Sequence, residues 1–134
     1  MSSPLQPQAT TTKPKKSLRV LYADDMRELR QLLEVVLGRD GHTVESVSDG
    51  HLAYELLKAN PAAYDVVITD HHMAKVSGLD LVARLRAMAY PGRIIVFSSE
   101  LSEEVDAHYR QLQVDHIMPK PVFPSDLRAL FATL

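Results

Sequence analysis

The chain alternates between short apolar runs and longer stretches in which apolar residues recur every three or four positions. The short runs are typical of β-strands. The third and fourth runs are apolar without alternation, which predicts inner strands of a parallel sheet that is covered on both faces. The predicted strands are Leu18–Ala23, Thr43–Val47, Tyr64–Thr69, Arg93–Ser98 and Val114–Met118.

The stretches between these runs have the spacing of amphipathic helices. Asp49 and Ser102 are suited to cap two of them, because a side-chain oxygen there can accept a backbone N–H of the first turn. The helix that Ser102 opens has a thin apolar face, made of Val105 and Leu112. The predicted helices run from Met26 to Gly38, from Asp49 to before Pro61, after Gly78, over Ser102–Gln113, and from Pro124 or Ser125 onward.

Successive strands begin 25, 21, 29 and 21 residues apart, which leaves room each time for one crossover helix. Five βα units in a row predict an α/β fold with a five-stranded parallel sheet, doubly wound, with helices on both faces and right-handed crossovers. The 134 residues are enough for one such domain and too few for two.

The first 16 residues differ from the rest in composition. They contain Pro4, Pro7, Pro14 and three lysines but no acidic residue, so they carry +3 of a net charge of −2 and leave −5 on the remaining 118 residues. Such a segment cannot bury enough apolar surface to fold. We therefore predict a disordered basic tail over residues 1–16 and one domain over residues 17–134.

Composition excludes several classes of function. The chain has no cysteine, which removes disulfides, thiolate metal sites and cysteine nucleophiles. Its mild acidity argues against a nucleic-acid partner, and its longest apolar runs are far shorter than the ~20 residues that span a bilayer. We expect a cytoplasmic protein that contacts neither nucleic acid nor membrane.

Polar residues follow four of the five predicted strands. In open α/β sheets, ligands bind beyond the carboxyl ends of the strands, so these residues are expected to converge on one edge. Each alone is weak evidence, since an aspartate after a strand is often a helix cap. The residues are Asp24 and Asp25 after the first strand, Asp70 after the third, Ser98 and Ser99 at the end of the fourth, and Lys120 after the fifth.

The chemistry of this set points to phosphoryl transfer. Three neighbouring carboxylates repel one another unless a cation lies between them, and an all-oxygen ligand set favours Mg²⁺. A lysine and a hydroxyl beside the cation supply donors for phosphoryl oxygens, and a carboxylate can itself accept a phosphoryl group. The residues therefore predict a Mg²⁺-dependent phosphoryl site with an aspartate nucleophile.

From about Leu18 to Leu134 the chain resembles the receiver domains of two-component response regulators, which have a flavodoxin-like fold. The resemblance rests on the ordered motifs Leu-Tyr-Ala-Asp24-Asp25, Val-Val-Ile-Thr-Asp70-His-His-Met with Gly78 downstream, Ile-Ile-Val-Phe-Ser98-Ser99 and Met-Pro-Lys120-Pro121.

The resemblance implies a role for each matched residue. Asp70 would accept a phosphoryl group from a phosphohistidine of a sensor histidine kinase or histidine phosphotransfer protein. Asp25 would bind Mg²⁺ directly and Asp24 largely through water, while Asp70 and the backbone carbonyl of His72 complete the protein ligands. Ser98 and Lys120 would each contact a phosphoryl oxygen, and the peptide bond before Pro121 would be cis.

The resemblance also implies how a signal would leave the domain. Ser98 would move toward the phosphoryl group, and the face formed by the last two predicted helices and the last strand would repack for a downstream protein partner. Since nothing follows Leu134, we expect the signal to leave through this surface or through onward transfer of the phosphoryl group. The only catalysis implied is self-phosphorylation and autodephosphorylation.

Four positions depart from the usual pattern or tune it. Ala74 stands where the family often has proline, and Ile117, whose β-branched aliphatic side chain does not provide an aromatic switch, stands where many receivers carry one. His72 and Glu100 occupy the two positions that usually tune phosphoryl lifetime. A carboxylate at Glu100 would either orient water or repel it, and the sequence does not choose between these effects.

Two other features invite a binding interpretation. The pair His71-His72 suggests a metal site, but adjacent loop residues are expected to point apart and no cysteine or second histidine pair supports one. The acidic cluster of Glu100, Glu103, Glu104 and Asp106 is better interpreted as a solvated helix N-terminus.

Two alternative functions remain open. A receiver-like interaction module that is never phosphorylated is compatible with Ala74 and Ile117. A phosphatase of the haloacid dehalogenase type is less favoured, because that class needs Asp-x-Asp after the first strand, and this chain has adjacent Asp24-Asp25.

Overall fold

The computed structural model describes residues 17–100 and 102–134, so the predicted tail lies outside the described residues. Five strands and five α-helices alternate along these residues, as the sequence predicts. The strands are β1 (Arg19–Ala23), β2 (Thr43–Val47), β3 (Val66–Asp70), β4 (Arg93–Ser98) and β5 (His116–Pro119). The helices are α2 (Arg27–Arg39), α3 (Gly50–Ala59), α4 (Gly78–Ala87), α5 (Glu103–Gln111) and α6 (Pro124–Phe131), with a short 3₁₀ turn, η1 (Pro61–Ala63).

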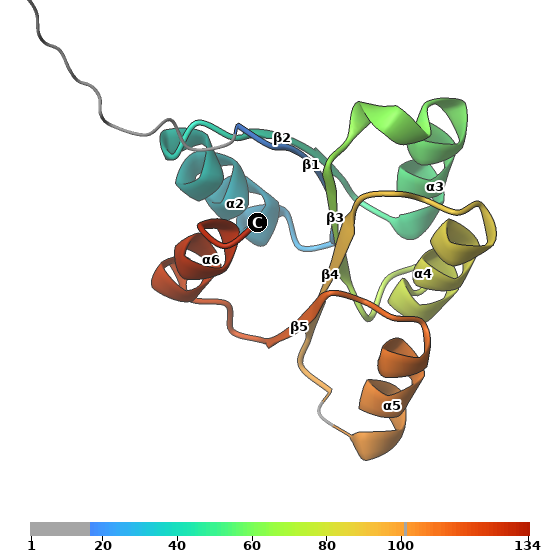
Figure 1. Ribbon diagram of the computed structural model, residues 1–134. Helices are drawn as coiled ribbons and strands as arrows, with labels where there is room; N and C mark the ends of the chain where they lie inside the picture. Colours follow the sequence, from blue (N-terminus) through green and yellow to red (C-terminus); the bar gives the residue numbers. More distant parts are fainter. Residues whose placement is uncertain (1–16, 101) are drawn as a thin grey trace, which may run out of the picture.

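The strands form one parallel sheet in the order β2-β1-β3-β4-β5. Helices α2 and α6 cover one face, and α3, α4 and α5 cover the other (Figure 1). The predicted doubly wound α/β fold is confirmed. Strands β3 and β4 lie inside the sheet and are buried along nearly their whole length, as their unbroken apolar runs predict.

Each face of the sheet has its own apolar core. On one face, Leu33 and Leu37 of α2 pack with Leu127 and Phe131 of α6. On the other, the buried side chains come from α3, α4 and α5, and Tyr109 is the buried residue of α5. The predicted caps also form, because the side chains of Asp49 and Ser102 accept backbone N–H groups of α3 and α5.

Three strand predictions were wrong at their ends. The first strand was expected to begin at Leu18 and begins one residue later, at Arg19. The third strand was expected to begin at Tyr64, but the 3₁₀ turn η1 precedes it and β3 begins at Val66. It also runs one residue further than expected, because Asp70 still pairs with Phe97 of β4. The fifth strand was expected at Val114 and begins at His116. The consequence for the site is that Asp70 is the last residue of β3 and belongs to the β3–β4 ladder.

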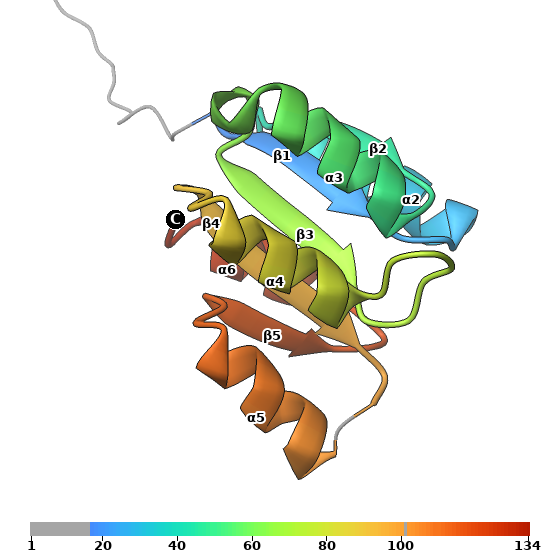
Figure 2. The same cartoon turned by 90° about the vertical axis from the view of Figure 1, so that its right-hand side faces the viewer.

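The register of the sheet aligns the ends of four strands. Ala23 of β1 pairs with Thr69 of β3, Asp70 with Phe97 of β4, and Ser98 with Pro119 of β5. The predicted site residues therefore lie at, or directly after, one line across the sheet. In Figure 2 the strand arrowheads point toward this edge, where the β3–α4 and β4–α5 loops also lie.

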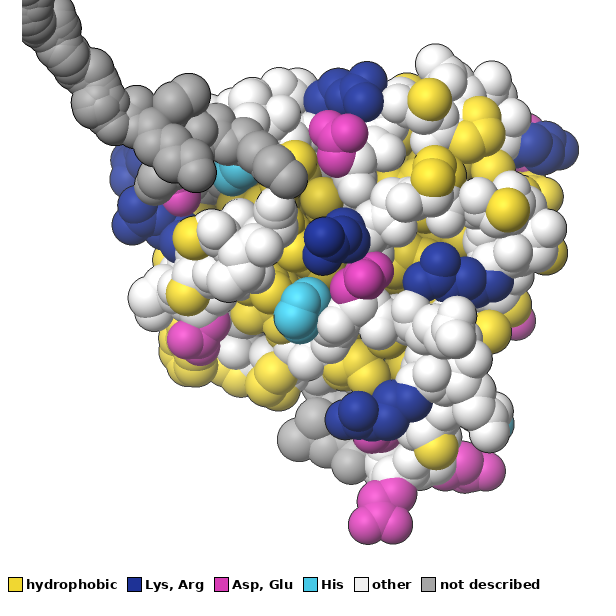
Figure 3. All heavy atoms as spheres, in the orientation of Figure 1, with side chains coloured by type: hydrophobic (Ala, Val, Ile, Leu, Met, Phe, Trp, Pro, Cys, Tyr) yellow, Lys and Arg dark blue, Asp and Glu magenta, His cyan; other side chains and the backbone are white. Residues whose placement is uncertain are grey.

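The opposite edge, at the amino ends of the strands, faces the viewer in Figure 3. Basic and acidic side chains are interspersed on this visible face, and neither sign forms a broad patch. Among the helices of the described residues, none combines the length and the apolar character that a membrane-spanning helix needs.

Candidate functional site

Three carboxylates meet at the carboxyl edge of the sheet. Asp24 and Asp25 follow β1, and Asp70 ends the neighbouring strand β3. One oxygen from each carboxylate lies within 4.8 Å of the others. Asp24 and Asp70 are buried, whereas Asp25 is exposed. The structure thus brings the three predicted acidic residues into one cluster with an exposed side.

Lys120 extends its ammonium group into this cluster from the end of β5. Its Nζ lies 2.9 Å from Asp70 Oδ1 and 3.2 Å from Asp24 Oδ2. Its backbone N–H donates to the carbonyl oxygen of Ser98, which extends the β4–β5 ladder by one bond. The peptide bond between Lys120 and Pro121 is cis, as the resemblance implies. Lys120, which follows β5, therefore contacts both buried carboxylates, which lie at the ends of β1 and β3.

Asp24 is held by neighbours that the sequence analysis did not identify. The hydroxyl of Tyr22 donates to Asp24 Oδ2 at 2.6 Å, and the backbone N–H of Met26 donates to Oδ1 at 2.9 Å. Tyr22 lies two residues before Asp24, so both side chains fall on one face of the extended chain. That spacing was visible in the sequence. These bonds orient Asp24 before any ligand arrives.

Burial and crowding shift the protonation of the cluster. Burial raises the pKa of Asp70, and the negative charge of Asp24 adds to this effect, while the hydrogen bond from Lys120 opposes it. For Lys120, burial alone would lower the pKa, but Asp70 and Asp24 outweigh it and raise the pKa. Ionisation of Asp70 is therefore less favourable than ionisation of an exposed aspartate, although the ammonium group of Lys120 lies beside it.

Asp70 has one carboxylate oxygen that is already engaged. Both Lys120 Nζ and the backbone N–H of His71 approach Oδ1 at 2.9 Å. Within the described residues, no hydrogen-bond donor to Oδ2 accompanies them. The arrangement fixes the carboxylate through one oxygen and leaves the other for a ligand or a reaction.

Ser98 is buried at the end of β4, but its hydroxyl is turned toward the following loop. Its Oγ donates to the carbonyl oxygen of Glu100 at 2.9 Å and accepts from the Glu100 backbone N–H at 3.0 Å. The structure places Ser98 at the predicted edge. It does not join the carboxylate cluster by a hydrogen bond in the conformation described.

The expectation that His71 and His72 point apart is wrong. Their ring centroids lie 4.6 Å apart, and the Nε2 atoms of both rings face Glu100 Oε1, at 3.8 Å for His71 and 3.1 Å for His72. Glu103, Glu104 and Asp106 form the acidic first turn of α5, as expected, whereas Glu100 lies before the helix and faces the two histidines. Adjacent side chains converge here because the chain leaves the strand at Asp70 and turns.

His71 is also bonded to a helix far away in the sequence. Its Nδ1 lies 2.6 Å from the hydroxyl of the buried Tyr109 in α5. Burial lowers the pKa of His71, and the charge of neighbouring His72 lowers it further. Sequence reasoning missed Tyr109, although it lies four residues after Val105 and three before Leu112. That spacing placed it on the apolar face of α5.

Ile117 is half-buried in β5 and packs against the same core as Tyr109. Ser98, Glu100, Tyr109 and Ile117 contribute to the lining of a hollow of about 160 Å³ beside α5. Ile117 of β5 thus lines this hollow on one side, and the aromatic side chain of Tyr109 in α5 lines it on the other.

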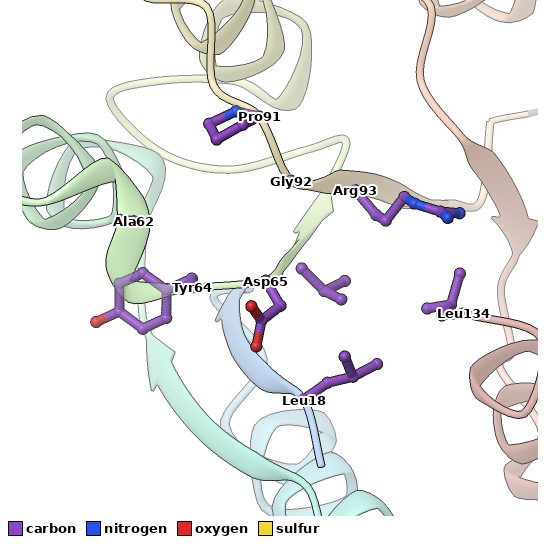
Figure 4. Close-up of a pocket in the computed structure, with 9 residues that line it drawn as sticks. Leu18, Ala62, Tyr64, Asp65, Pro91, Gly92, Arg93 and Leu134 are labelled. Carbon is purple, nitrogen blue, oxygen red and sulfur yellow. The ribbon is translucent and has the colours of Figure 1, made fainter. Parts of the chain in front are cut away.

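A larger hollow lies at the other end of the sheet and contains none of the predicted site residues. It has a volume of about 360 Å³ and is lined by residues at or before the amino ends of the strands and by the last residue of the chain (Figure 4). Its lining includes Leu18, Asp65, Arg93 and Leu134. The chemistry predicted from the sequence is confined to the carboxyl edge.

Comparison with known proteins matches most of the chain to one family. A family model described as the response regulator receiver domain matches residues 20–132. The virulence sensor protein BvgS of Bordetella pertussis is 37% identical over 127 residues, which cover 90% of this chain and 10% of that protein. The sensory/regulatory protein RpfC of Xanthomonas campestris pv. campestris is 30% identical over 123 residues, which cover 89% of this chain and 17% of that protein. The chain thus spans a small part of these relatives.

Solved structures agree with these sequence matches. The chemotaxis response regulator CheY4 of Vibrio cholerae superposes with a TM-score of 0.77 at 29% identity. The match covers 89% of this chain and all of that one.

Proposed function

The chain belongs to the response regulator receiver domain family of two-component signalling, and on that premise we propose that Asp70 is its phosphoacceptor. The donor would be a phosphohistidine on a sensor histidine kinase or a histidine phosphotransfer protein. The observation that carries the proposal is the Lys120–Asp70 contact of 2.9 Å inside a cluster of three carboxylates. We place this activity in the cytoplasm, where such kinases present their phosphohistidine.

In the proposed transfer, Oδ2 of Asp70 attacks the phosphorus of the phosphohistidine. The new O–P bond forms as the N–P bond breaks, and the bonding electron pair returns to the imidazole nitrogen, which then takes a proton from water. The products are an acyl phosphate on Asp70 and free histidine. Lys120 and the backbone N–H of His71 hold Oδ1 meanwhile, so the nucleophile is oriented in advance.

The acidic cluster fits a magnesium ion. Its donors are all carboxylate oxygens, which Mg²⁺ prefers. Burial and the charge of Asp24 disfavour the ionised form of Asp70, and a bound cation would offset both effects. Asp24, Asp25 and Asp70 would hold the ion, and the resemblance adds the backbone carbonyl of His72. When bound, Mg²⁺ supplies positive charge that offsets the negative charge of the phosphoryl oxygens.

We further propose that Ser98 carries the signal away from Asp70. A phosphoryl group on Asp70 offers new acceptor oxygens, and the hydroxyl of Ser98 would leave the Glu100 backbone to donate to one of them. The β4–α5 loop would then lose two hydrogen bonds. The face formed by α5, β5 and α6 would change in response and bind a downstream protein, with Ile117 contributing packing instead of an aromatic switch.

The proposed acceptor is tested by intact mass measurement of the full chain after incubation with acetyl phosphate and Mg²⁺. We expect one phosphoryl group per chain, dependent on Mg²⁺ and removed by hydroxylamine, which cleaves acyl phosphates. Asp70→Asn should take up none. Asp65→Asn is the matched control, because Asp65 lies just before the opposite end of the same strand, and it should be phosphorylated normally.

Two outcomes would contradict this proposal. If the wild-type chain takes up no phosphoryl group from any donor, the interaction-module alternative is favoured. If Asp70→Asn is still phosphorylated, the acceptor is another residue. Steady release of phosphate from simple phosphomonoesters without an adduct would favour a phosphatase.

The role of Lys120 is tested separately, because uptake and response are different steps. We expect Lys120→Ala to be phosphorylated on Asp70 but to lose the accompanying chemical-shift changes in α5, β5 and α6. Equal shift changes in both proteins after phosphorylation would show that Lys120 does not couple the site to that face.

A further inference from the structure

A second group of potential metal ligands lies beside the carboxylate cluster and shares no side chain with it. His71 and His72 come from the β3–α4 loop, and Glu100 comes from the β4–α5 loop. One donor atom from each lies within 4.8 Å of the others. The group therefore joins two loops that are 28 residues apart in sequence.

The spacing of the donor atoms suits a small tetrahedral ion. Ligand atoms about 2.0–2.2 Å from a tetrahedral metal lie about 3.3–3.6 Å from one another. Glu100 Oε1 lies 3.1 Å from His72 Nε2 and 3.8 Å from His71 Nε2, on either side of that range. Shifts of a few tenths of an ångström in the donor atoms would bring both distances into this range. The side chains of His72 and Glu100 have room for such shifts, because they are 65% and 40% exposed.

The third ligand is held from behind by a hydrogen bond. His71 Nδ1 lies 2.6 Å from the hydroxyl of Tyr109, and both side chains are buried. A metal-binding imidazole usually donates its other N–H to an oxygen, which fixes the ring and its tautomer. In the tautomer whose Nδ1–H donates to the Tyr109 oxygen, the Nε2 lone pair of His71 is on the side of Glu100 and can bind a metal ion.

We propose that His71, His72 and Glu100 form a binding site for a divalent transition-metal ion such as Zn²⁺, with Tyr109 as the positioning residue for His71. Two imidazoles and one carboxylate are a known zinc ligand set, which leaves the fourth position for water. Imidazole selects Zn²⁺ and its neighbours, whereas the all-oxygen cluster of Asp24, Asp25 and Asp70 selects Mg²⁺. The two sites would hold different metals side by side.

A bound ion would connect the loop that follows Asp70 to the loop whose backbone holds the Ser98 hydroxyl. The proposal itself concerns binding only. It does not depend on whether Asp70 is phosphorylated, so the two proposals can fail independently.

The test is calorimetric titration of the full chain with Zn²⁺ in buffer that contains millimolar Mg²⁺. We expect one Zn²⁺ per chain, and we expect His72→Ala or Glu100→Gln to weaken binding at least tenfold. Tyr109→Phe should weaken it about 10-fold or more through loss of the oxygen that holds His71 Nδ1. Circular dichroism verifies that each variant is folded, and the exposed position of His72 makes its variant the safest.

Two control variants test whether Zn²⁺ binds at these three residues and not elsewhere on the chain. His108→Ala removes another exposed histidine, from α5, and should bind Zn²⁺ like the wild type. Asp25→Asn disables the proposed Mg²⁺ cluster and should also retain Zn²⁺ binding. The proposal is overturned if Zn²⁺ does not bind, if binding survives in His72→Ala, or if it is lost in Asp25→Asn or displaced by Mg²⁺.

Discussion

Strand β3 has an aspartate at each end, and the two are in opposite electrostatic situations. Asp65, just before the strand, accepts the backbone N–H of Arg19 at 2.8 Å and two further bonds from its guanidinium group at 3.1 and 3.2 Å. Asp70, at the other end, shares Lys120 with Asp24. Hydrogen bonds from Arg19 lower the pKa of Asp65, whereas burial raises the pKa of Asp70.

The difference separates a structural end of the sheet from a functional one. At the amino end, Asp65 pairs with Arg19 near solvent. At the carboxyl end, three acidic residues form one cluster and Lys120 contacts two of them, an arrangement that costs stability until a metal cation binds. The crowded carboxylates of the carboxyl end therefore mark the functional site more clearly than the size of a hollow does, since the larger of the two hollows lies at the amino end.

The largest loss of stability is expected from substitutions of two glycines, Gly78 near the carboxyl end of β3 and Gly92 near its amino end. A Cβ on Gly78 would lie 2.5 Å from the Asp70 carbonyl oxygen and 2.6 Å from the Tyr109 hydroxyl. Gly78→Ala should lower the free energy of unfolding by about 1–3 kcal/mol, as overpacking does. It should also impair phosphoryl uptake, because the backbone of Asp70 must move. Chemical denaturation and intact mass measurement check the two effects.

Gly92→Ala is the matched control at the amino end. Its Cβ would lie 2.6 Å from the Asp65 carbonyl oxygen and against the Tyr90 side chain. We expect a similar loss of stability with normal phosphoryl uptake in the folded protein. Equal loss of uptake in both variants would mean that the two ends are not functionally distinct.

A smaller change in stability is expected when one negative charge is removed from the carboxylate cluster. In Mg²⁺-free buffer at neutral pH, Asp70→Asn should raise the melting temperature by a few degrees. The pKa of Asp70 is raised on folding, so its ionisation costs stability above that pKa. The gain should shrink as the pH falls through the raised pKa toward the unfolded value of 3.8. Thermal unfolding across this pH range checks it.

Magnesium provides the control for that experiment. Millimolar Mg²⁺ should raise the melting temperature of the wild type by binding its native state, and should have little effect on Asp70→Asn or Asp25→Asn. A lower melting temperature for Asp70→Asn without Mg²⁺ would show that the Lys120 contact outweighs the burial and repulsion of the carboxylate.

The smallest effect is expected at Asp65, and it has the opposite sign. Asp65→Asn should lower the melting temperature slightly at neutral pH, because the pair with Arg19 lies at the surface and solvent screens it. The pKa of Asp65 is lowered on folding, so its contribution is present above 3.8 and is lost as the pH falls through the lower folded pKa. A melting temperature that does not change between wild type and variant at neutral pH would remove the contrast with Asp70.

The doubly wound parallel sheet and the edge that carries the site could be predicted because both follow from local patterns. Apolar runs and helical stripes predict βα units, and the chirality of crossovers leaves few ways to assemble them. Asp24, Asp70 and Lys120 follow strands in the sequence, so a parallel sheet brings them to one edge. Errors of one or two residues at β1, β3 and β5 did not change this result, since the ladder register aligns the strand ends.

The contacts between side chains of different loops could not be predicted in the same way. Glu100 was assigned to a solvated helix end, and His71 and His72 were expected to diverge, because sequence spacing does not describe the direction of side chains in an irregular loop. The hydrogen bond between His71 and Tyr109 joins residues 38 positions apart, from a loop and a helix that meet only in the folded protein.

The sequence by itself determined the architecture, the edge at which chemistry occurs and the residue types found there, because hydrophobic periodicity and the order of elements along the chain are local properties. Only the tertiary structure decided which atoms meet: which oxygen of Asp70 is engaged, where the Ser98 hydroxyl points, and that two imidazoles and a carboxylate face one another. The physical reason is that these contacts depend on the packing of loops and helices against the sheet, and packing is a property of the whole chain.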